Sequence, residues 1–233
     1  MSNALAAVTK TALISYPKQA EFGRVVPKNK IYEHSGANTK QKELFIEQVE
    51  QIVWQYKLAP ETINLPAKPD VPELQIFSIQ LKTPELNWDV LRCIDGAVPY
   101  PIIFELSFAG RTQVVAAYKR THDADANRWV VSDYFATAWL PSDSVRAPMP
   151  TTLNLGLLYE QLLMRLLPIV ARPYEPLAEL LERVVQVKAK QREMEKVASK
   201  LAKERQFNRR VEMNSLLRQL TNELEQLTDR KDV

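Results

Sequence analysis

The sequence predicts an α+β protein, in which an antiparallel β-sheet with packed helices is followed by a long C-terminal helical, coiled-coil-like arm. Residues 74–81 alternate apolar and polar side chains, which is the period of a half-buried strand. From Leu177 onward apolar residues recur every three or four positions, and no glycine lies beyond Gly156. That pattern is typical of long uninterrupted helix. We therefore expect an α+β domain, a helical connector and the arm, at residues 1–150, 151–176 and 177–233.

The N-terminal part of the chain predicts edge strands and one long helix. Two short extended pieces end at a proline or just beyond one, and they fit edge strands or a strap across the body; they are residues 12–17 and 24–28. Apolar residues at three- and four-residue spacing then predict a helix over 40–56. Asn38 or Thr39 can cap its N-terminus, because either side chain can accept a bond from a free backbone N–H.

The central part predicts a helix followed by a β-hairpin. A short helix capped by Asn87 or Asp89 is expected to end near Ala97. Ala109 and Gly110 form the expected hairpin turn between two strands. One or two further strands follow, so that the full set of expected strands after this helix is 102–108, 112–119, 128–131 and 134–139.

The last third predicts helix almost throughout. A leucine-rich helix over 153–167 precedes the arm, whose leucine seam is clearest at Leu217, Leu220, Leu224 and Leu227. The seam thins within 203–214, which leaves two interpretations open. The arm is either one helix that pairs with a second chain, or it turns near Asn208 and packs back on itself as a helical hairpin. Continuous helix is favoured, because neither glycine nor proline marks a turn.

Composition excludes several classes of protein. Cys93 is the single cysteine, which rules out an internal disulfide and is typical of a reducing compartment. His34 and His122 are far apart and lack a cysteine partner, so we expect no metal site, and scattered glycines give no phosphate-binding loop, so we expect no cofactor. No apolar run reaches the ~18 residues of a membrane span, and the N-terminus lacks the basic start of a signal peptide. A cytoplasmic protein without membrane contact is expected.

One charged trio invites a catalytic interpretation. Asp95, Glu105 and Lys119 offer the carboxylates and lysine with which restriction-type nucleases hold a divalent metal and stabilise charge at a phosphate. The spacing argues against this, because the hairpin turn sets Glu105 opposite Gln113 or Val114. Lys119 then lies about 15 Å further along its strand. The favoured interpretation is that Asp95 supports a helix end and that Glu105 and Lys119 are surface charges.

The middle of the arm is rich in basic residues. Between Arg183 and Arg210 the acids are Glu193, Glu195 and Glu204, against many more lysines and arginines. A solvated helix face explains this excess, and so does contact with a phosphate backbone. The candidate nucleic-acid-binding residues are Lys203, Arg205, Arg209 and Arg210. Arg205 and Arg209 are four positions apart, so they share a face of a continuous helix.

Four stretches of the sequence resemble an uncharacterised bacterial family, a domain of unknown function of about this length. The stretches are 56–65, 94–106, 117–120 and 203–214. Members of that family are encoded beside a large helicase and a site-specific DNA methyltransferase in restriction-like phage-defence clusters. The resemblance covers the chain from about Pro27 to Leu227. It implies an accessory component of an antiviral defence system, and it implies no catalytic residue.

Together these observations lead us to expect a non-catalytic accessory or adaptor subunit of a restriction-like anti-phage complex. It would dock on a larger helicase or DNA methyltransferase subunit through the leucine seam, and it would contact DNA through the basic residues. Self-association through the C-terminal helix is open as well. The alternative is a metal-dependent nuclease subunit that acts with a helicase and uses Asp95, Glu105 and Lys119.

Overall fold

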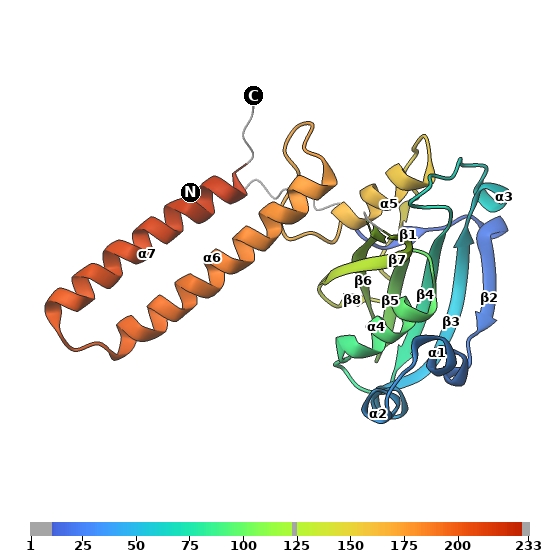
Figure 1. Ribbon diagram of the computed structural model, residues 1–233, viewed down its shortest axis with the longest axis horizontal. Helices are drawn as coiled ribbons and strands as arrows, with labels where there is room; N and C mark the ends of the chain where they lie inside the picture. The colour runs from blue at the N-terminus through green and yellow to red at the C-terminus, as the bar shows by residue number, and fades with distance from the viewer. Residues whose placement is uncertain (1–10, 123–124, 230–233) are drawn as a thin grey trace. The chain divides into compact units, whose positions relative to one another are not determined.

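The computed structural model describes residues 11–122 and 125–229. The described chain divides into two compact units, with the boundary between Leu166 and Leu167. The first unit is a mixed α+β body built on one large sheet, and the second unit is a pair of helices (Figure 1). No helix among the described residues combines the length and the apolar character that crossing a membrane requires.

The body is organised around a mixed sheet. Its described strands follow one another in the order β2 (Glu21–Val25), β3 (Val49–Leu58), β4 (Leu74–Leu81), β5 (Ile102–Phe108), β6 (Arg111–His122) and β7 (Asp125–Ala136), and β8 (Leu140–Pro141) also pairs with β6. A separate parallel pair joins β1 (Ile14–Ser15) to β9 (Ala147–Pro148).

The large sheet is mostly antiparallel, as the predicted fold class has it, but β4 and β5 run parallel. The connection between them is α4 (Trp88–Ala97), since parallel neighbours cannot be joined by a tight turn. Asn87 caps α4 by accepting a hydrogen bond from the backbone N–H of Asp89. The predicted turn at Ala109 and Gly110 is confirmed, and both residues have positive φ angles, 46° and 75°.

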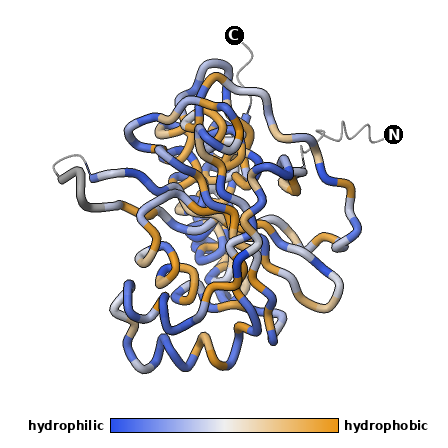
Figure 2. Tube along the Cα trace, turned by 90° about the vertical axis from the view of Figure 1, so that its right-hand side faces the viewer, coloured by the Kyte–Doolittle hydropathy of each residue, from blue (hydrophilic) through white to orange (hydrophobic). Residues whose placement is uncertain are grey.

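Three helices cover one face of the sheet and enclose the main core. They are α1 (Lys28–Ser35), α2 (Thr39–Gln48) and α4. Phe45 of α2 and Leu91 of α4 are fully buried with Phe104 of β5 in one cluster. Figure 2 colours the trace by hydropathy and shows hydrophobic and hydrophilic segments alternating along the chain. The remaining helices of the body are η1 (Lys18–Ala20), α3 (Pro60–Ile63) and α5 (Leu155–Met164).

The predicted helix over 40–56 is wrong beyond Gln48. Helix α2 ends at Gln48, and the chain continues directly as strand β3. The segment that switches is rich in β-branched and aromatic residues, including Val53 and Trp54, which pack well on a pleated surface. The start of α2 follows the sequence, because Asn38 and Gln41 form a reciprocal capping box with both bonds at 2.9 Å.

The second unit contains α6 (Leu177–Lys203) and α7 (Phe207–Thr228), and the favoured continuous helix is therefore wrong. The helices pack antiparallel as a helical hairpin, with Lys190 of α6 bonded to Glu223 of α7 at 2.6 Å. The turn between the two helices contains neither glycine nor proline, and the side chain of Glu204 stabilises it instead. Its carboxylate accepts the backbone N–H groups of Arg205 and Gln206, each at 2.8 Å, where helical bonds would otherwise form.

Candidate functional site

Two members of the predicted trio meet inside the body. Asp95 lies in the last turn of α4, and Lys119 lies on β6. The ammonium Nζ of Lys119 is 3.6 Å from Oδ1 of Asp95. Lys119 is 1% exposed and Asp95 is 5% exposed. The interpretation of Lys119 as a surface charge is therefore wrong, because its long side chain reaches across the core face to the end of α4.

The Lys119 ammonium caps the C-terminus of helix α4. It donates hydrogen bonds to the backbone carbonyls of Asp95 and Val98, which are acceptors that the last helical turn leaves without a partner. A positive charge at this end also complements the negative end of the helix dipole. The ring of Trp129 lies 5.7 Å from the same ammonium, close enough for a cation–π contact. Lys119 is thus occupied by structural contacts.

Two tyrosines complete the cluster. The Tyr134 hydroxyl donates to Oδ2 of Asp95. The Tyr159 hydroxyl, from α5, accepts the backbone N–H of Lys119 at 2.9 Å and donates to the carbonyl of Ala117 at 2.6 Å. It does so where the pairing of β6 with β7 shifts register, so Tyr159 satisfies backbone groups that the ladder leaves over. We call Asp95, Lys119, Tyr134 and Tyr159 the buried cluster.

Burial controls the protonation of the charged pair. Loss of solvent raises the pKa of Asp95 to about 6, while the Lys119 ammonium and the Tyr134 hydroxyl oppose that rise. Burial lowers the pKa of Lys119, and Asp95 opposes that fall. Burial and the neighbouring Asp95 also raise the pKa of the Tyr134 hydroxyl, so this group stays protonated and donates. At neutral pH Asp95 is therefore the ionised partner of Lys119.

Glu105 does not join the other two members of the trio. It pairs with Val114 across the hairpin, as the turn predicted, so Lys119 lies five positions further along β6. Glu105 alternates with core residues of β5 and faces the opposite side of the sheet. There it forms a two-pronged ion pair with Arg146, whose Nη1 and Nη2 lie 2.8 and 2.7 Å from the carboxylate oxygens. The side chains needed for the nuclease alternative are not gathered at one place.

The described residues offer little else for a metal. They contain no group of three or more His, Cys, Asp or Glu side chains arranged to hold an ion. Cys93 is buried in the core of the body, and burial raises the pKa of its thiol. The rest of the sheet unit therefore contributes no further cluster of metal ligands in the part of the chain that the structure describes.

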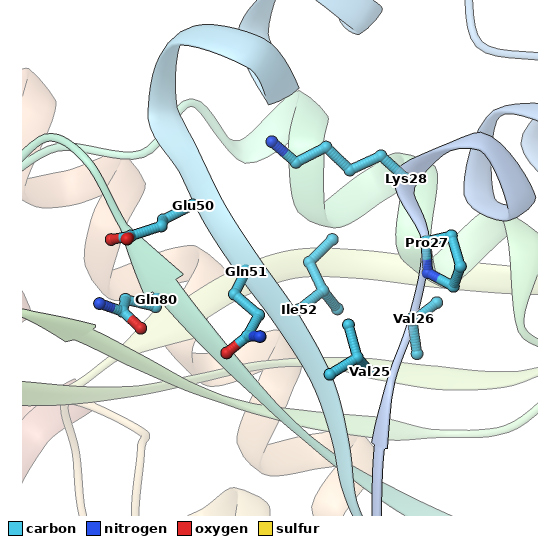
Figure 3. Close-up of a pocket in the computed structure, with 8 residues that line it drawn as sticks. All are labelled: Val25, Val26, Pro27, Lys28, Glu50, Gln51, Ile52 and Gln80. Atoms are coloured by element: carbon cyan, nitrogen blue, oxygen red, sulfur yellow. The ribbon is translucent and has the colours of Figure 1, made fainter.

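Two hollows in the surface of the body are lined by residues that also hold the fold together. The one drawn in Figure 3 has a volume of about 360 Å³ and lies where the ends of β2 and β3 meet α1. Its lysine, Lys28, donates to the carbonyls of Phe45 and Val49 and so ends α2. A second hollow of about 530 Å³ lies beside the buried cluster and mixes both signs of charge, including Lys68, Asp70 and Glu160. Neither arrangement selects one kind of ligand.

In the helical unit, the leucine seam lies on the inside of the hairpin. Leu220 is 2% exposed and Leu217, Leu224 and Leu227 are half-buried. Helix α6 packs against this seam in an antiparallel register in which Lys190 bonds Glu223 and the Thr221 hydroxyl lies 3.8 Å from the sulfur of Met194, so the half-buried Met194 and Val197 lie alongside it. The seam therefore has a partner within its own chain, which the favoured continuous helix would not have given it. The role predicted for these leucines in binding another protein stays a prediction.

The predicted nucleic-acid-binding residues separate at the hairpin turn. Lys203 ends α6, Arg205 lies in the connection, and Arg209 and Arg210 lie in the first turn of α7. Nη1 of Arg209 lies 3.9 Å from Oε2 of Glu204, and both Arg209 and Arg210 are exposed. Arg205 and Arg209 do not share a helical face, because the helix is interrupted between them. Their predicted role in binding nucleic acid remains a prediction.

Sequence reasoning missed the buried ionic contacts of both units. In the helical unit Arg183 is 5% exposed and binds both carboxylate oxygens of Glu175 at 2.7 Å. It also donates to the carbonyls of Val170 and Leu227, which ties the end of α7 to the start of α6. For Lys119 there was a signal in the sequence. It stands in phase with the core residues Val115 and Ala117 on a strand, where a lysine must be buried or mark a bulge.

Comparison with known proteins places the chain in a family. A family model for a domain of unknown function, DUF4391, matches residues 14–224. The match spans both units and nearly the whole chain, so the protein belongs to this family. No curated protein matches the chain, and no solved structure matches it.

Proposed function

We propose that this protein is a cytoplasmic accessory subunit of a bacterial anti-phage defence complex, one that binds a larger helicase or DNA methyltransferase subunit and helps it to engage DNA. The observation that carries the proposal is the exposed apolar surface at the turn of the helical hairpin. Phe207 is 78% exposed and Val211 is 52% exposed. They lie four positions apart on α7, so they share one helical face.

Large apolar side chains that lie together in water favour contact with another protein. Phe207 and Val211 are not needed to close the hairpin, since Leu220 and its neighbours do that on the inner face. We therefore move the expected docking contact from the leucine seam to this pair, called the apolar pair below. An aromatic side chain at the centre of a small patch is typical of residues that dominate binding energy.

The charges of the body support the same role indirectly. Lys119 and Asp95 are occupied in holding α4 and β6 together, and Glu105 is bound to Arg146. The nuclease alternative stays a prediction, and no contact among the described residues favours it. An accessory role requires no reacting group, and it uses the surface that the fold leaves exposed.

Co-expression with the neighbouring helicase and methyltransferase subunits tests the proposal. The wild-type chain should co-purify with one of them, and the double variant Phe207→Ser/Val211→Ser should lose at least tenfold of that capture. The matched control is Val25→Ser/Ile46→Ser, which removes two apolar side chains of the body that are 58% and 60% exposed. Capture that is equal for both double variants, or absent for the wild type, contradicts the proposal. Self-association of the wild type that the Phe207 variant abolishes would contradict it too, because it assigns the pair to a second copy.

A further inference from the structure

The two sides of the helical hairpin carry opposite charge. An α-helix turns by about 100° per residue, so positions along α6 can be assigned to either side of its buried seam. One side of α6 carries Lys188, Arg192, Lys196 and Lys203. The other side carries Glu179, Glu182 and Glu193 together with Lys190 and Lys200. Basic residues therefore outnumber acids on one side of α6, and acids outnumber basic residues on the other.

Helix α7 continues the same division. The ion pair between Lys190 and Glu223 shows which sides of the two helices adjoin. Antiparallel helices are related by an approximate twofold axis perpendicular to the plane that contains them, so the side opposite Lys190 on α6 adjoins the side opposite Glu223 on α7. That side of α7 carries Arg210 and Arg218, whereas Glu212 lies on the side of Glu223. We call the resulting surface the basic face: Lys188, Arg192, Lys196, Lys203, Arg210 and Arg218.

Three cations of the basic face, Arg192, Lys196 and Arg218, are available for a ligand. Arg192, Lys196 and Arg218 are exposed, and within the chain that the structure describes they form no ion pair. By contrast, Lys190 on the other side bonds both Glu193 and Glu223. The acids near the basic face are Glu195 and Glu225, too few to neutralise it. Arg192 and Lys196 line a shallow hollow of about 450 Å³ with Glu195, Ser199 and Lys200.

The spacing of these cations fits a polyanion with regularly placed charges. Four residues of α-helix rise about 6 Å, so Arg192 and Lys196 are separated by about that distance along the axis. From Lys188 to Lys203 the stripe runs about 22 Å, over which duplex DNA carries one negative charge per about 1.7 Å. The stripe on α6 contains no aromatic side chain that could stack on bases. Its chemistry therefore matches phosphates rather than base edges.

We propose that the basic face binds the phosphate backbone of a nucleic-acid duplex, without reading its sequence. The inference rests on the proposed accessory role for its biological purpose, since it supplies the DNA contact that a helicase or methyltransferase complex would use. It differs from the sequence-based assignment in its residues. Arg192, Lys196 and Arg218 become the principal contacts, and Arg205 and Arg209 at the hairpin turn become peripheral.

The test compares two double variants of the full chain that remove equal charge from the same unit. Arg192→Gln/Lys196→Gln acts on the basic face, and Arg205→Gln/Arg209→Gln acts at the turn. Affinity for a short labelled DNA duplex is measured without any partner subunit over a range of NaCl concentrations. The basic-face variant should bind roughly tenfold more weakly, and the slope of log affinity against log salt should fall by about 1 for each lost phosphate contact. The turn variant should stay within about twofold of the wild type.

Further binding measurements identify the kind of nucleic acid and separate this proposal from the proposed accessory role. A DNA duplex, an RNA duplex and a single strand of equal length are compared, and tighter binding to either duplex supports the inference and names the ligand. Tighter binding to the single strand overturns it. So does an equal loss in both double variants, or a wild-type affinity that does not change with salt. Because these measurements use the isolated protein, DNA binding can fail while co-purification with the helicase or methyltransferase persists, and the reverse.

Discussion

In the body, Lys119 and Asp95 are almost fully enclosed and form an ion pair; Asp95 accepts a hydrogen bond from Tyr134, and Lys119 donates to the carbonyl end of α4. In the helical hairpin, Arg192 and Lys196 are exposed and unpaired within the described chain. The same residue types thus serve opposite purposes. Buried charges must be matched by nearby groups, and matching them leaves nothing over for a ligand. Exposed charges of one sign keep their capacity to bind.

Among the predicted effects on stability, the largest is expected when one charge of the buried Lys119–Asp95 pair is removed. Lys119→Met keeps the length of the side chain but leaves the Asp95 carboxylate buried without its cation, which should lower the free energy of unfolding by about 3–5 kcal/mol. Urea unfolding measures this loss. The control is Lys119→Met/Asp95→Asn, which should recover a large part of it, because no unpaired charge remains. A single variant as stable as the wild type would show that the buried pair does not hold α4 to the sheet.

The sequence allowed only part of the buried cluster to be predicted. The strands over 74–81 and 102–119 and the helix ending at Ala97 followed from period and turn residues. The contact of Asp95 with Lys119 could not follow, because it depends on α4 crossing between two parallel strands. The apolar and polar pattern of a short segment does not show which distant residues are brought together by a helix that connects two parallel strands.

Two other expectations failed where local signals were ambiguous. The apolar residues of 49–56 fit a helix or a strand equally well over so short a run, and pairing with β4 decided for the strand. The turn between α6 and α7 needed no glycine, because the Glu204 side chain bonds the backbone instead. For the site, the sequence drew attention to Asp95 and Lys119, but it could not show that both are buried.

The next largest effect concerns pH and is specific to the body. The folded-state pKa of Asp95, about 6, lies above its ordinary value of 3.8, so the folded protein binds a proton more tightly than the unfolded chain does. This residue therefore contributes stability below about pH 4 that is lost as pH rises to about 6, on the order of 2–3 kcal/mol. The measurement is the stability of wild type minus that of Asp95→Asn from pH 4 to pH 7.

This difference should fall as pH rises through that window and then level off. A constant difference would mean that Asp95 titrates at its ordinary pKa and is less enclosed than its contacts indicate.

A smaller effect is expected at the partly exposed ion pair of the body. Arg146 is 37% exposed at its side chain, and its bidentate contact with Glu105 is shared with solvent. Arg146→Ala should lower the free energy of unfolding by about 1 kcal/mol, since the bidentate contact is stronger than a single surface ion pair but is weakened by solvent at the partly exposed Arg146. Thermal unfolding with Glu105→Gln as the companion variant checks this. A loss as large as that of Lys119→Met would break the distinction between buried and exposed pairs.

The smallest effect on stability is expected on the basic face. Arg192→Gln/Lys196→Gln removes charges that touch no other described residue through an ion pair, so the free energy of unfolding should change by no more than about 0.5 kcal/mol for each substitution. Urea unfolding provides the check. A clear gain in stability would agree with relief of repulsion between like charges, whereas a loss of several kcal/mol would mean that these residues support the hairpin.

The central claim is that function lies on the hairpin surface and that the buried cluster serves the fold. It is tested most directly by capture of the chain by a co-expressed helicase or methyltransferase subunit, the proposed partner, with Lys119→Met/Asp95→Asn compared with Phe207→Ser/Val211→Ser. The account predicts that the folded cluster variant is captured as well as the wild type and that the apolar-pair variant is captured at least tenfold less. Loss of capture in the folded cluster variant, with the apolar-pair variant unaffected, would contradict it.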